Sequence, residues 1–323
     1  MLQGVLSSRK IVDKLPHDRA HLLSDNGIDG EPTDLFLDSI DRWLAAQLSD
    51  DGAKDEGTGA SIGSVAISKG SGLVAGRFPI DRLIGCYFDS CEVDWLVDEG
   101  ESVLPGREVL RLSGPSSSVL SCERVLMNIL GRMSGIATLT AEWVGESLGV
   151  AIACTRKTAW GLLDKWAVHV GGGLTHRLSR SDALMIKEND LAVMGLEGFR
   201  DGSIRGAVSS IDLELHASFS VIEVRNSDQA VAAASAWSEI QENGGRTQKL
   251  VLLLDNMGPQ GCRIAKDQLE ASGLRKWCIL EGSGGVTRGD LPDWVRVSGV
   301  DVLSTSEINM AARPLDFSML VGD

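Results

Sequence analysis

The chain has 323 residues, of which 43% are apolar, a size and composition typical of a globular protein with more than one structural unit. A net charge of −14 argues against nucleic-acid partners, which require a basic surface. No apolar run reaches the roughly 18 residues of a membrane span, and Arg9, Lys10 and Lys14 interrupt any secretory signal. Six cysteines without CxxC or zinc-site spacing are typical of reduced thiols. We therefore expect a cytoplasmic protein that binds neither membranes nor nucleic acids.

The first third of the chain changes from loop to short strands. Residues 1–35 are polar and mixed, and a first helix is predicted over 35–47, where Ile40 and Leu44 share an apolar side. From 65 to 112, apolar and polar residues alternate between Gly and Pro turns, which predicts a small β-rich domain.

The rest of the chain alternates between two kinds of segment. Leu126, Leu130 and Met133 have helical spacing, and short, continuously apolar runs such as "VAIACT" and "LVLLLD" then alternate with amphipathic segments. Such runs are typical of strands buried on both faces, so this alternation favours a parallel sheet or a β/α barrel. In a barrel, function lies on the loops that follow the strands.

Cations gather at the predicted ends of the early strands. They are joined there by one imidazole, and the set is Arg156, Lys157, His176, Arg177 and Lys187. In an otherwise acidic protein, such a cluster at one barrel mouth would attract a polyanion, because arginine suits carboxylates and lysine suits phosphates.

Later strand ends carry a different chemistry. Glu223 and Asp255 would repel a pyrophosphate unless a hard cation lay between them, and Mg²⁺ commonly uses one or two carboxylates together with substrate oxygens. The "EGSGG" loop can present backbone N–H groups and the Ser283 hydroxyl to a phosphate, with Ser304 on the next strand. The residues predict a Mg²⁺-dependent site for a phosphorylated substrate and an anionic second substrate.

Ordinary structural roles remain open for each of these residues. A single cation at a strand end is usually a surface charge, Glu223 and Asp255 could cap helices, and a lone "GSGG" occurs in many loops. The combination at successive strand ends is what favours the functional interpretation.

Several segments resemble the quinolinate phosphoribosyltransferase family, in the family's order. They are "ERVLMNILGRMSGIAT", "TRKT…GLLDKWAVHVGGGLTHRLSRSDALMIKEN", "LLLDNM", "LEGSGGV" and "GVDVLSTSEI", and the likeness runs from Val93 to Ser306. The chain departs from the family pattern at Cys154, usually Asp, at Asp190, usually His, and at Ser306, often Gly.

The resemblance implies an α/β fold with an N-terminal α/β sandwich domain and a C-terminal, incomplete β/α barrel. The expected parts are an N-terminal extension (1–35), the sandwich (36–118), the barrel (119–305) and a C-terminal segment returning to the N-terminal domain (306–323). It also implies conversion of quinolinate and phosphoribosyl pyrophosphate to nicotinate mononucleotide, pyrophosphate and CO₂, in de novo NAD biosynthesis.

The resemblance also assigns roles to residues. Arg124 would enter the neighbouring site of a homodimer, and Glu223 and Asp255 would lie near the ribose hydroxyls and Mg²⁺. The cationic set would line the substrate pocket, with Lys157 and Lys187 acting catalytically beside Glu223 and Asp255, and the 5′-phosphate would be held by Ser283, Gly284 and Gly285. Two alternatives stay open: a divergent phosphoribosyltransferase acting on nicotinate or another carboxylate, and a non-catalytic phosphate-ligand binder.

Overall fold

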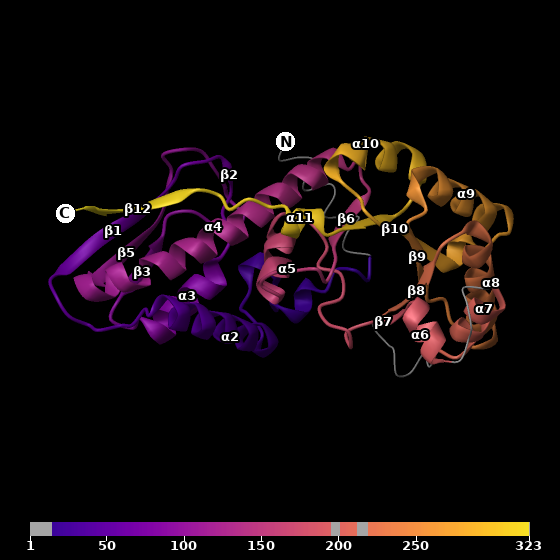
Figure 1. Cartoon of the computed structure of the whole chain (residues 1–323), viewed down its shortest axis with the longest axis horizontal. Helices are drawn as coiled ribbons and strands as arrows, with labels where there is room; N and C mark the ends of the chain where they lie inside the picture. The colour runs from indigo at the N-terminus through magenta and orange to yellow at the C-terminus, as the bar shows by residue number, and fades with distance from the viewer. Residues whose placement is uncertain (1–14, 195–200, 212–218, 323) are drawn as a thin grey trace. The chain divides into compact units, whose positions relative to one another are not determined.

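The computed structural model of the chain describes residues 15–194, 201–211 and 219–322, which group into two compact units (Figure 1). The barrel unit comprises residues 15–18, Trp143–Arg156 and His176–Glu307. The sandwich unit comprises Arg19–Glu142, Lys157–Thr175 and residues 308–322. Contacts thus place the segment 157–175, which lies inside the predicted barrel range, with the sandwich. Most of the predicted extension, residues 1–14, lies outside the described residues.

The sandwich unit is built on a four-stranded antiparallel sheet. Its strand order is β12-β1-β5-β3, with β1 over Ser61–Ser68, β3 over Glu92–Trp95, β5 over Glu108–Pro115 and β12 over Phe317–Gly322. Two short strands, β2 (Gly72–Leu73) and β4 (Ser102–Val103), pair separately. Because β12 pairs with β1, the last residues of the chain add the edge strand of this N-terminal sheet (Figure 1).

Helices complete the sandwich unit. They are α2 (Asp34–Asp51), α3 (Arg77–Tyr87), α4 (Ser116–Glu146), α5 (Leu162–Val170) and α11 (Glu307–Met310). The predicted first helix is α2, which begins where the Thr33 side chain accepts from the Phe36 backbone N–H and ends at Gly52, whose φ is +66°. Helix α4 belongs to the sandwich unit as far as Glu142. Glu307, the first residue of α11, belongs to the barrel unit.

Within the described residues, the barrel unit contains six parallel strands in the order β6-β11-β10-β9-β8-β7. They are β6 (Ala151–Cys154), β7 (Leu184–Ile186), β8 (Ser220–Val224), β9 (Leu250–Asp255), β10 (Cys278–Ser283) and β11 (Val302–Thr305). Almost every strand residue is buried, as the continuous apolar runs predict. In the described pairings β6 and β7 remain edges, which confirms the α/β class and is consistent with an incomplete barrel.

Helices of the barrel unit follow its strands. They are α6 (Glu188–Val193), α7 (Asp201–Ser209), α8 (Ser227–Asn243), α9 (Gly258–Ala271) and α10 (Leu291–Asp293), and α7, α8 and α9 lie on the outer side of β8 and β9 (Figure 1). Single turns complete the chain at Ala20–Leu22, Gly27–Asp29, Arg275–Trp277, Arg288–Asp290 and Trp294–Ser298. Among the described helices, none combines the length and hydrophobicity needed to cross a bilayer.

Candidate active site

Strand register brings acidic and basic candidates to one face of the parallel sheet. Glu223 on β8 is opposite Leu253 on β9, and Leu253 is opposite Glu281 on β10. Side chains at matched positions of parallel strands point to the same face, so Glu223 and Glu281 share a face. Lys187 directly follows the Ile186–Ile222 pair and forms an ion pair with Glu223 at 2.8 Å.

A second row of candidates lies one pleat repeat further along the same strands. Asp255 is opposite Ser283, and each is two residues beyond the first row, so both point to the face of Glu223 and Glu281. Ser304 on β11 follows the Gly282–Leu303 pair and therefore aligns with Ser283. The carboxylates and hydroxyls predicted for metal and phosphate thus line successive layers of one surface.

The loop after β10 has the backbone of an anion cradle. Gly284 and Gly285 have φ values of +102° and +61°, a region that favours glycine. A Cβ on Gly284 would lie 2.7 Å from the Asn256 backbone nitrogen, so only glycine fits there without movement. A glycine turn after a strand can present backbone N–H groups to an anion, which suits the predicted phosphate contact.

Arg177 is a buried cation beside a second cation. Its guanidinium donates to the carbonyls of Ala183 and Arg180 at 3.3 and 3.4 Å, and only 6% of the residue is exposed. Burial lowers the pKa of Arg177 and repulsion from Arg156 lowers it further. A bound anion would reverse both effects, because it replaces lost solvation and offsets the like charge.

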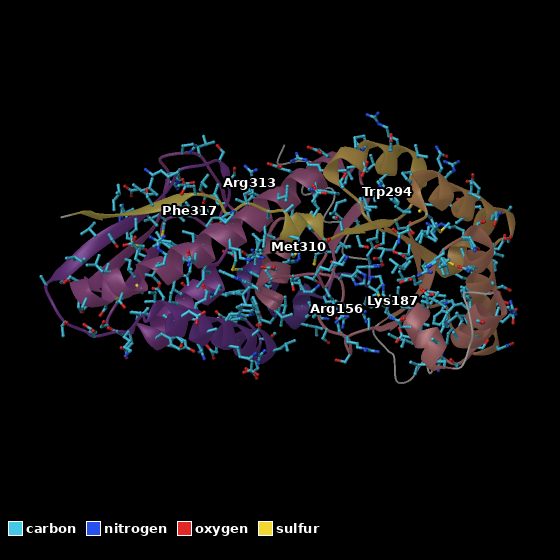
Figure 2. The ribbon with its side chains drawn as sticks, viewed as in Figure 1. Arg156, Lys187, Trp294, Met310, Arg313 and Phe317 are labelled. Atoms are coloured by element: carbon cyan, nitrogen blue, oxygen red, sulfur yellow. The ribbon has the colours of Figure 1, made fainter. Side chains whose placement is uncertain are left out.

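Arg156 and Lys187 follow the two edge strands of the parallel sheet. Arg156 comes two residues after β6 and is exposed, and Lys187 comes directly after β7 (Figure 2). The described ion pairs of the barrel unit do not include Arg156 or Arg177. Both guanidinium groups therefore keep their charge available for an anionic ligand.

Acidic and basic residues around α6 form a second network. Glu223, 5% exposed, lies 3.7 Å from Arg225, which also pairs with Glu188 at 2.6 Å. Asp190 accepts from the Lys187 backbone N–H at 3.0 Å and pairs with Arg180 at 3.3 Å. The acidic residue that departs from the family pattern thus has a local role at the start of α6, because it satisfies a backbone donor there.

His176 is held through both ring nitrogens. Its Nδ1 accepts from the Arg177 backbone N–H at 2.7 Å, and its Nε2 lies 3.1 and 3.2 Å from the two oxygens of Glu281. His17 Nε2 also lies 3.1 Å from Glu281. A direct contact of His176 with quinolinate would require one of these hydrogen bonds to be exchanged.

Glu281 and His17 were not predicted as site residues. Burial by itself raises the pKa of Glu281, but attraction to His176 and hydrogen bonds from both histidines hold it well below its usual range. A carboxylate inside the apolar run "CILEG" was a usable signal for Glu281, since a buried charge requires partners. His17 stands in a polar stretch without a repeating pattern, and nothing local pointed to it.

Arg124 and Lys157 belong to the sandwich unit. Arg124 is exposed on α4, and the Lys157 carbonyl accepts from Asn309 Nδ2 at 2.9 Å. Their roles in the site stay predictions.

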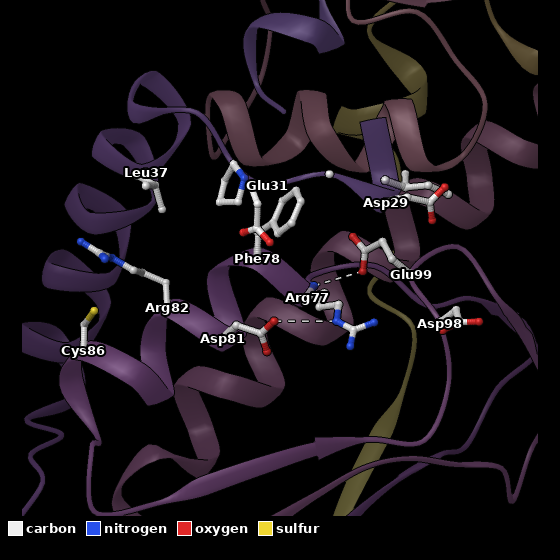
Figure 3. A pocket seen from close by; sticks show the side chains of 13 residues that line it. Asp29, Glu31, Leu37, Arg77, Phe78, Asp81, Arg82, Cys86, Asp98 and Glu99 are labelled. Atoms are coloured by element: carbon white, nitrogen blue, oxygen red, sulfur yellow. Dashed lines mark hydrogen bonds and ion pairs between the residues drawn. The ribbon is translucent and has the colours of Figure 1, made fainter. Parts of the chain in front are cut away.

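A cavity of about 870 Å³ lies within the sandwich unit and contains none of the predicted site residues. Half-buried Glu99 accepts from the backbone N–H groups of Gly76 and Arg77 and from Trp166 Nε1, so it caps the start of α3 (Figure 3). Burial nevertheless raises the pKa of Glu99. Arg77 also pairs with Asp81 at 3.7 Å. Because Glu99 already has these donors, we interpret it as a structural carboxylate.

Comparisons with known proteins identify the family of the chain. The family model for the N-terminal domain of quinolinate phosphoribosyl transferase matches residues 56–134, and the model for its C-terminal domain matches residues 136–320. The probable nicotinate-nucleotide pyrophosphorylase (carboxylating) of Archaeoglobus fulgidus is 36% identical over 271 residues, which are 80% of this chain and 94% of that protein. The protein of the same name from Methanothermobacter thermautotrophicus is 35% identical over 270 residues, covering 81% and 88%. A crystal structure of NadC from Streptococcus pyogenes is 28% identical with a TM-score of 0.70, and the match covers 90% of this chain and 100% of that one. The chain therefore belongs to the quinolinate phosphoribosyl transferase family.

Proposed function

We propose that the protein joins quinolinate to phosphoribosyl pyrophosphate and releases CO₂ and pyrophosphate, giving nicotinate mononucleotide for de novo NAD biosynthesis. Family membership over both domains supports this activity. The observation that carries it is the buried Arg177 guanidinium, whose pKa is lowered first by burial and then by repulsion from Arg156. A ligand with two carboxylates matches two guanidinium groups in charge and geometry.

The reaction follows from this charge placement. Arg156 and Arg177 hold the quinolinate carboxylates, so that the pyridine nitrogen faces C1 of the ribose. The nitrogen forms a bond to C1 while the bond from C1 to the pyrophosphate oxygen breaks, and Lys157 and Lys187 stabilise the charge that develops on the leaving group. The ring, now cationic, accepts the electron pair of the carbon–carboxylate bond as CO₂ leaves, and the ring carbon then takes up a proton.

Glu223 and Asp255 are the residues that would hold Mg²⁺. Both are oxygen donors on one sheet face, and Asp255 is half-buried with a hydrogen bond from Asn256 Nδ2 at 2.7 Å. This donor set fits a cation that binds through one or two carboxylates and substrate oxygens. When bound, Mg²⁺ would neutralise charge on the pyrophosphate. The Lys187–Glu223 ion pair holds both side chains in place on this face.

The decisive experiment incubates purified protein with quinolinate, phosphoribosyl pyrophosphate and Mg²⁺ and follows nicotinate mononucleotide by chromatography. We expect product, release of one CO₂ per turnover, and loss of activity after chelation of the metal. Parallel reactions with nicotinate test the divergent-enzyme alternative. Product from nicotinate but not from quinolinate would replace this proposal, and binding of both substrates without turnover would favour the non-catalytic binder.

We also propose that the protein is a homodimer in which Arg124 completes the partner's site. Arg124 is exposed on α4, which supports a contact with a second copy of the chain. Mixing an Arg124→Ala chain with a Lys157→Ala chain should restore a fraction of the activity, because one site of each heterodimer then carries both native residues. Zero recovery in a verified heterodimer would refute sharing of the site.

A further inference from the structure

Three polar side chains meet in the interior of the barrel unit. His17, His176 and Glu281 are 0%, 4% and 1% exposed, and both imidazoles are bonded to the one carboxylate at about the same distance, 3.1 Å. The two rings meet edge to face with centroids 5.0 Å apart, and Phe219 contacts both. Because buried charges and buried imidazoles are costly without partners, this packing fixes all three side chains together.

Hydrogen bonding selects between two interpretations of this cluster. Two histidines and a carboxylate with ligand atoms within 4.8 Å of one another have the composition of a metal site. The Arg177 backbone N–H, however, donates to His176 Nδ1, so Nδ1 carries the lone pair and Nε2 carries the proton. An Nε2–H that faces Glu281 is a hydrogen-bond donor and not a metal ligand. The cluster is therefore a hydrogen-bonded unit.

The backbone at His176 shows what the cluster supports. His176 has a φ of +50°, a left-handed conformation that non-glycine residues rarely adopt and that persists only when surrounding contacts hold it. The next residue is Arg177, whose own backbone N–H closes the turn onto the imidazole. The conformation of His176 thus sets the direction in which the Arg177 side chain leaves the loop.

We infer that His17, Glu281 and His176 form a positioning triad that holds the left-handed turn at His176 and thereby orients the Arg177 guanidinium toward the pyridine dicarboxylate. The inference rests on the proposed function, because it assigns Arg177 to substrate binding. Glu281 accepts hydrogen bonds from both imidazoles, and the His176 imidazole holds the turn. His17 contacts Oε2 of Glu281 and so keeps that carboxylate in place. His17 acts through two other residues and does not touch substrate.

This triad gives the N-terminal segment a function. The family match begins at residue 56, whereas residues 15–18 group with the barrel unit, and His17 reaches Glu281 across 264 positions. A segment upstream of the family region therefore supplies one side of the support for the site.

The test compares four variants with the unmodified chain. His17→Phe removes the donor and keeps a ring, His17→Gln keeps an N–H donor, and Glu281→Gln removes the charge that both imidazoles share. His21→Phe is the matched control, since His21 is exposed and four positions away. Thermal unfolding of each variant sets an assay temperature at which all chains are folded.

Steady-state kinetics provide the first readout. We expect His17→Phe and Glu281→Gln to raise KM for quinolinate by about tenfold or more, the effect of losing one hydrogen bond to a charged group, with KM for phosphoribosyl pyrophosphate unchanged. His17→Gln should recover most of this loss. A purely structural role would lower turnover and leave both KM values unchanged, and this result would overturn the inference.

Combining His17→Phe with Glu281→Gln provides the second kinetic readout. Residues of one network are not additive, so the double variant should be no worse than Glu281→Gln alone. If the two substitutions multiplied each other's effect on KM, His17 and Glu281 would act independently, and the triad would be refuted. If His17→Phe does not fold, His17→Gln takes its place, and the KM for quinolinate of the His17→Gln, Glu281→Gln double variant is compared with that of Glu281→Gln alone.

NMR of ¹⁵N-labelled histidine separates this inference from the proposed function. The unmodified chain should show His176 as the Nε2–H tautomer, and His17→Phe should shift that signal while His21→Phe leaves it unchanged. This result is independent of turnover, so an inactive wild-type chain refutes the function and not the triad. An Nδ1–H tautomer, or stoichiometric zinc that is lost in His17→Phe, would overturn the triad.

Discussion

Two arginines, Arg132 in the sandwich unit and Arg177 in the barrel unit, have different charged surroundings. In the sandwich unit, Arg132 donates to both oxygens of fully buried Asp164 at 2.9 and 2.7 Å, and Asp164 also accepts from two backbone N–H groups. In the barrel unit, buried Arg177 has two carbonyls as its acceptors, and among its charged neighbours Arg156 has the largest effect on its pKa. The charge of Arg132 is therefore neutralised within the protein, whereas Arg177 keeps a positive charge that an anionic ligand can neutralise.

This difference distinguishes an arginine that stabilises the fold from one that is available to a ligand. A carboxylate with a bidentate arginine and backbone donors is fully satisfied, so it stabilises the fold and has little left to offer a substrate. A cation that is buried beside another cation has lost solvation and is repelled by the like charge. A doubly anionic ligand offsets both unfavourable contributions. Variants of the two units should therefore separate stability from activity.

The largest effect is expected for Arg132→Ala in the sandwich unit. The change leaves Asp164 charged and buried without its ion-pair partner, which typically costs about 3–5 kcal/mol in the free energy of unfolding. Chemical denaturation measures this loss, and Arg82→Ala, which opens a half-exposed pair with Asp41, is the matched control. A loss below about 1 kcal/mol would show that the Arg132–Asp164 pair is not an essential part of the fold.

Arg177→Ala should have the opposite signature in the barrel unit. Turnover is expected to fall at least ~10²-fold, which is typical of deleting one charge-stabilising group, while the free energy of unfolding stays unchanged or rises because a buried like charge is gone. The assay is formation of nicotinate mononucleotide. Arg180→Ala, an 82% exposed neighbour in the same loop, should stay close to the native rate. Near-native turnover of Arg177→Ala would remove Arg177 from the site.

The two units should also respond to pH with opposite signs. Glu281 has a pKa held well below its ordinary 4.5, so its contribution to stability is present above 4.5 and is lost as the pH falls through its lower folded value. Glu99 has a pKa raised above 4.5, chiefly by burial, so it lowers stability as the pH rises from 4.5 through its higher folded value.

Thermal unfolding of two variants across the acidic range measures this contrast. As pH rises, the Tm of Glu281→Gln should fall relative to the native protein below about pH 4.5, and that of Glu99→Gln should rise relative to it above about pH 4.5. Parallel pH profiles for both variants would contradict the assigned shifts.

Asp41→Asn should have the smallest effect. A hydrogen bond from Arg82 lowers the pKa of Asp41, but both side chains are about a third exposed, at 34% and 32%, and such pairs contribute about 0–1 kcal/mol. Thermal unfolding at two salt concentrations should show a small loss that shrinks as salt screens the pair. A large loss of stability would mean that surface ion pairs of the sandwich unit also stabilise the fold substantially.

The candidate site was predictable where its residues stand at strand ends. Asp255 and Ser283 followed from apolar runs that stop at polar residues, because parallel strands bring their carboxyl ends to one edge, and Glu223 was predicted as the acidic residue within the run "VIEV". Lys187 was predicted as a phosphate contact, yet its ion pair with Glu223 depends on the register of β7 and β8, which no local pattern encodes. Glu281 lies inside β10 and was overlooked, although a carboxylate within the apolar run "CILEG" was a usable signal.

The sequence by itself determined the class of fold, the family and the set of charges, since periodicity, turn residues and motif spacing act over a few residues. Tertiary structure alone decided which of those charges form ion pairs within the protein and which remain available to a ligand. It brought His17 to Glu281 and β12 to β1, contacts between residues hundreds of positions apart. Such contacts depend on burial and strand register across the folded chain, and these are properties of the packed molecule.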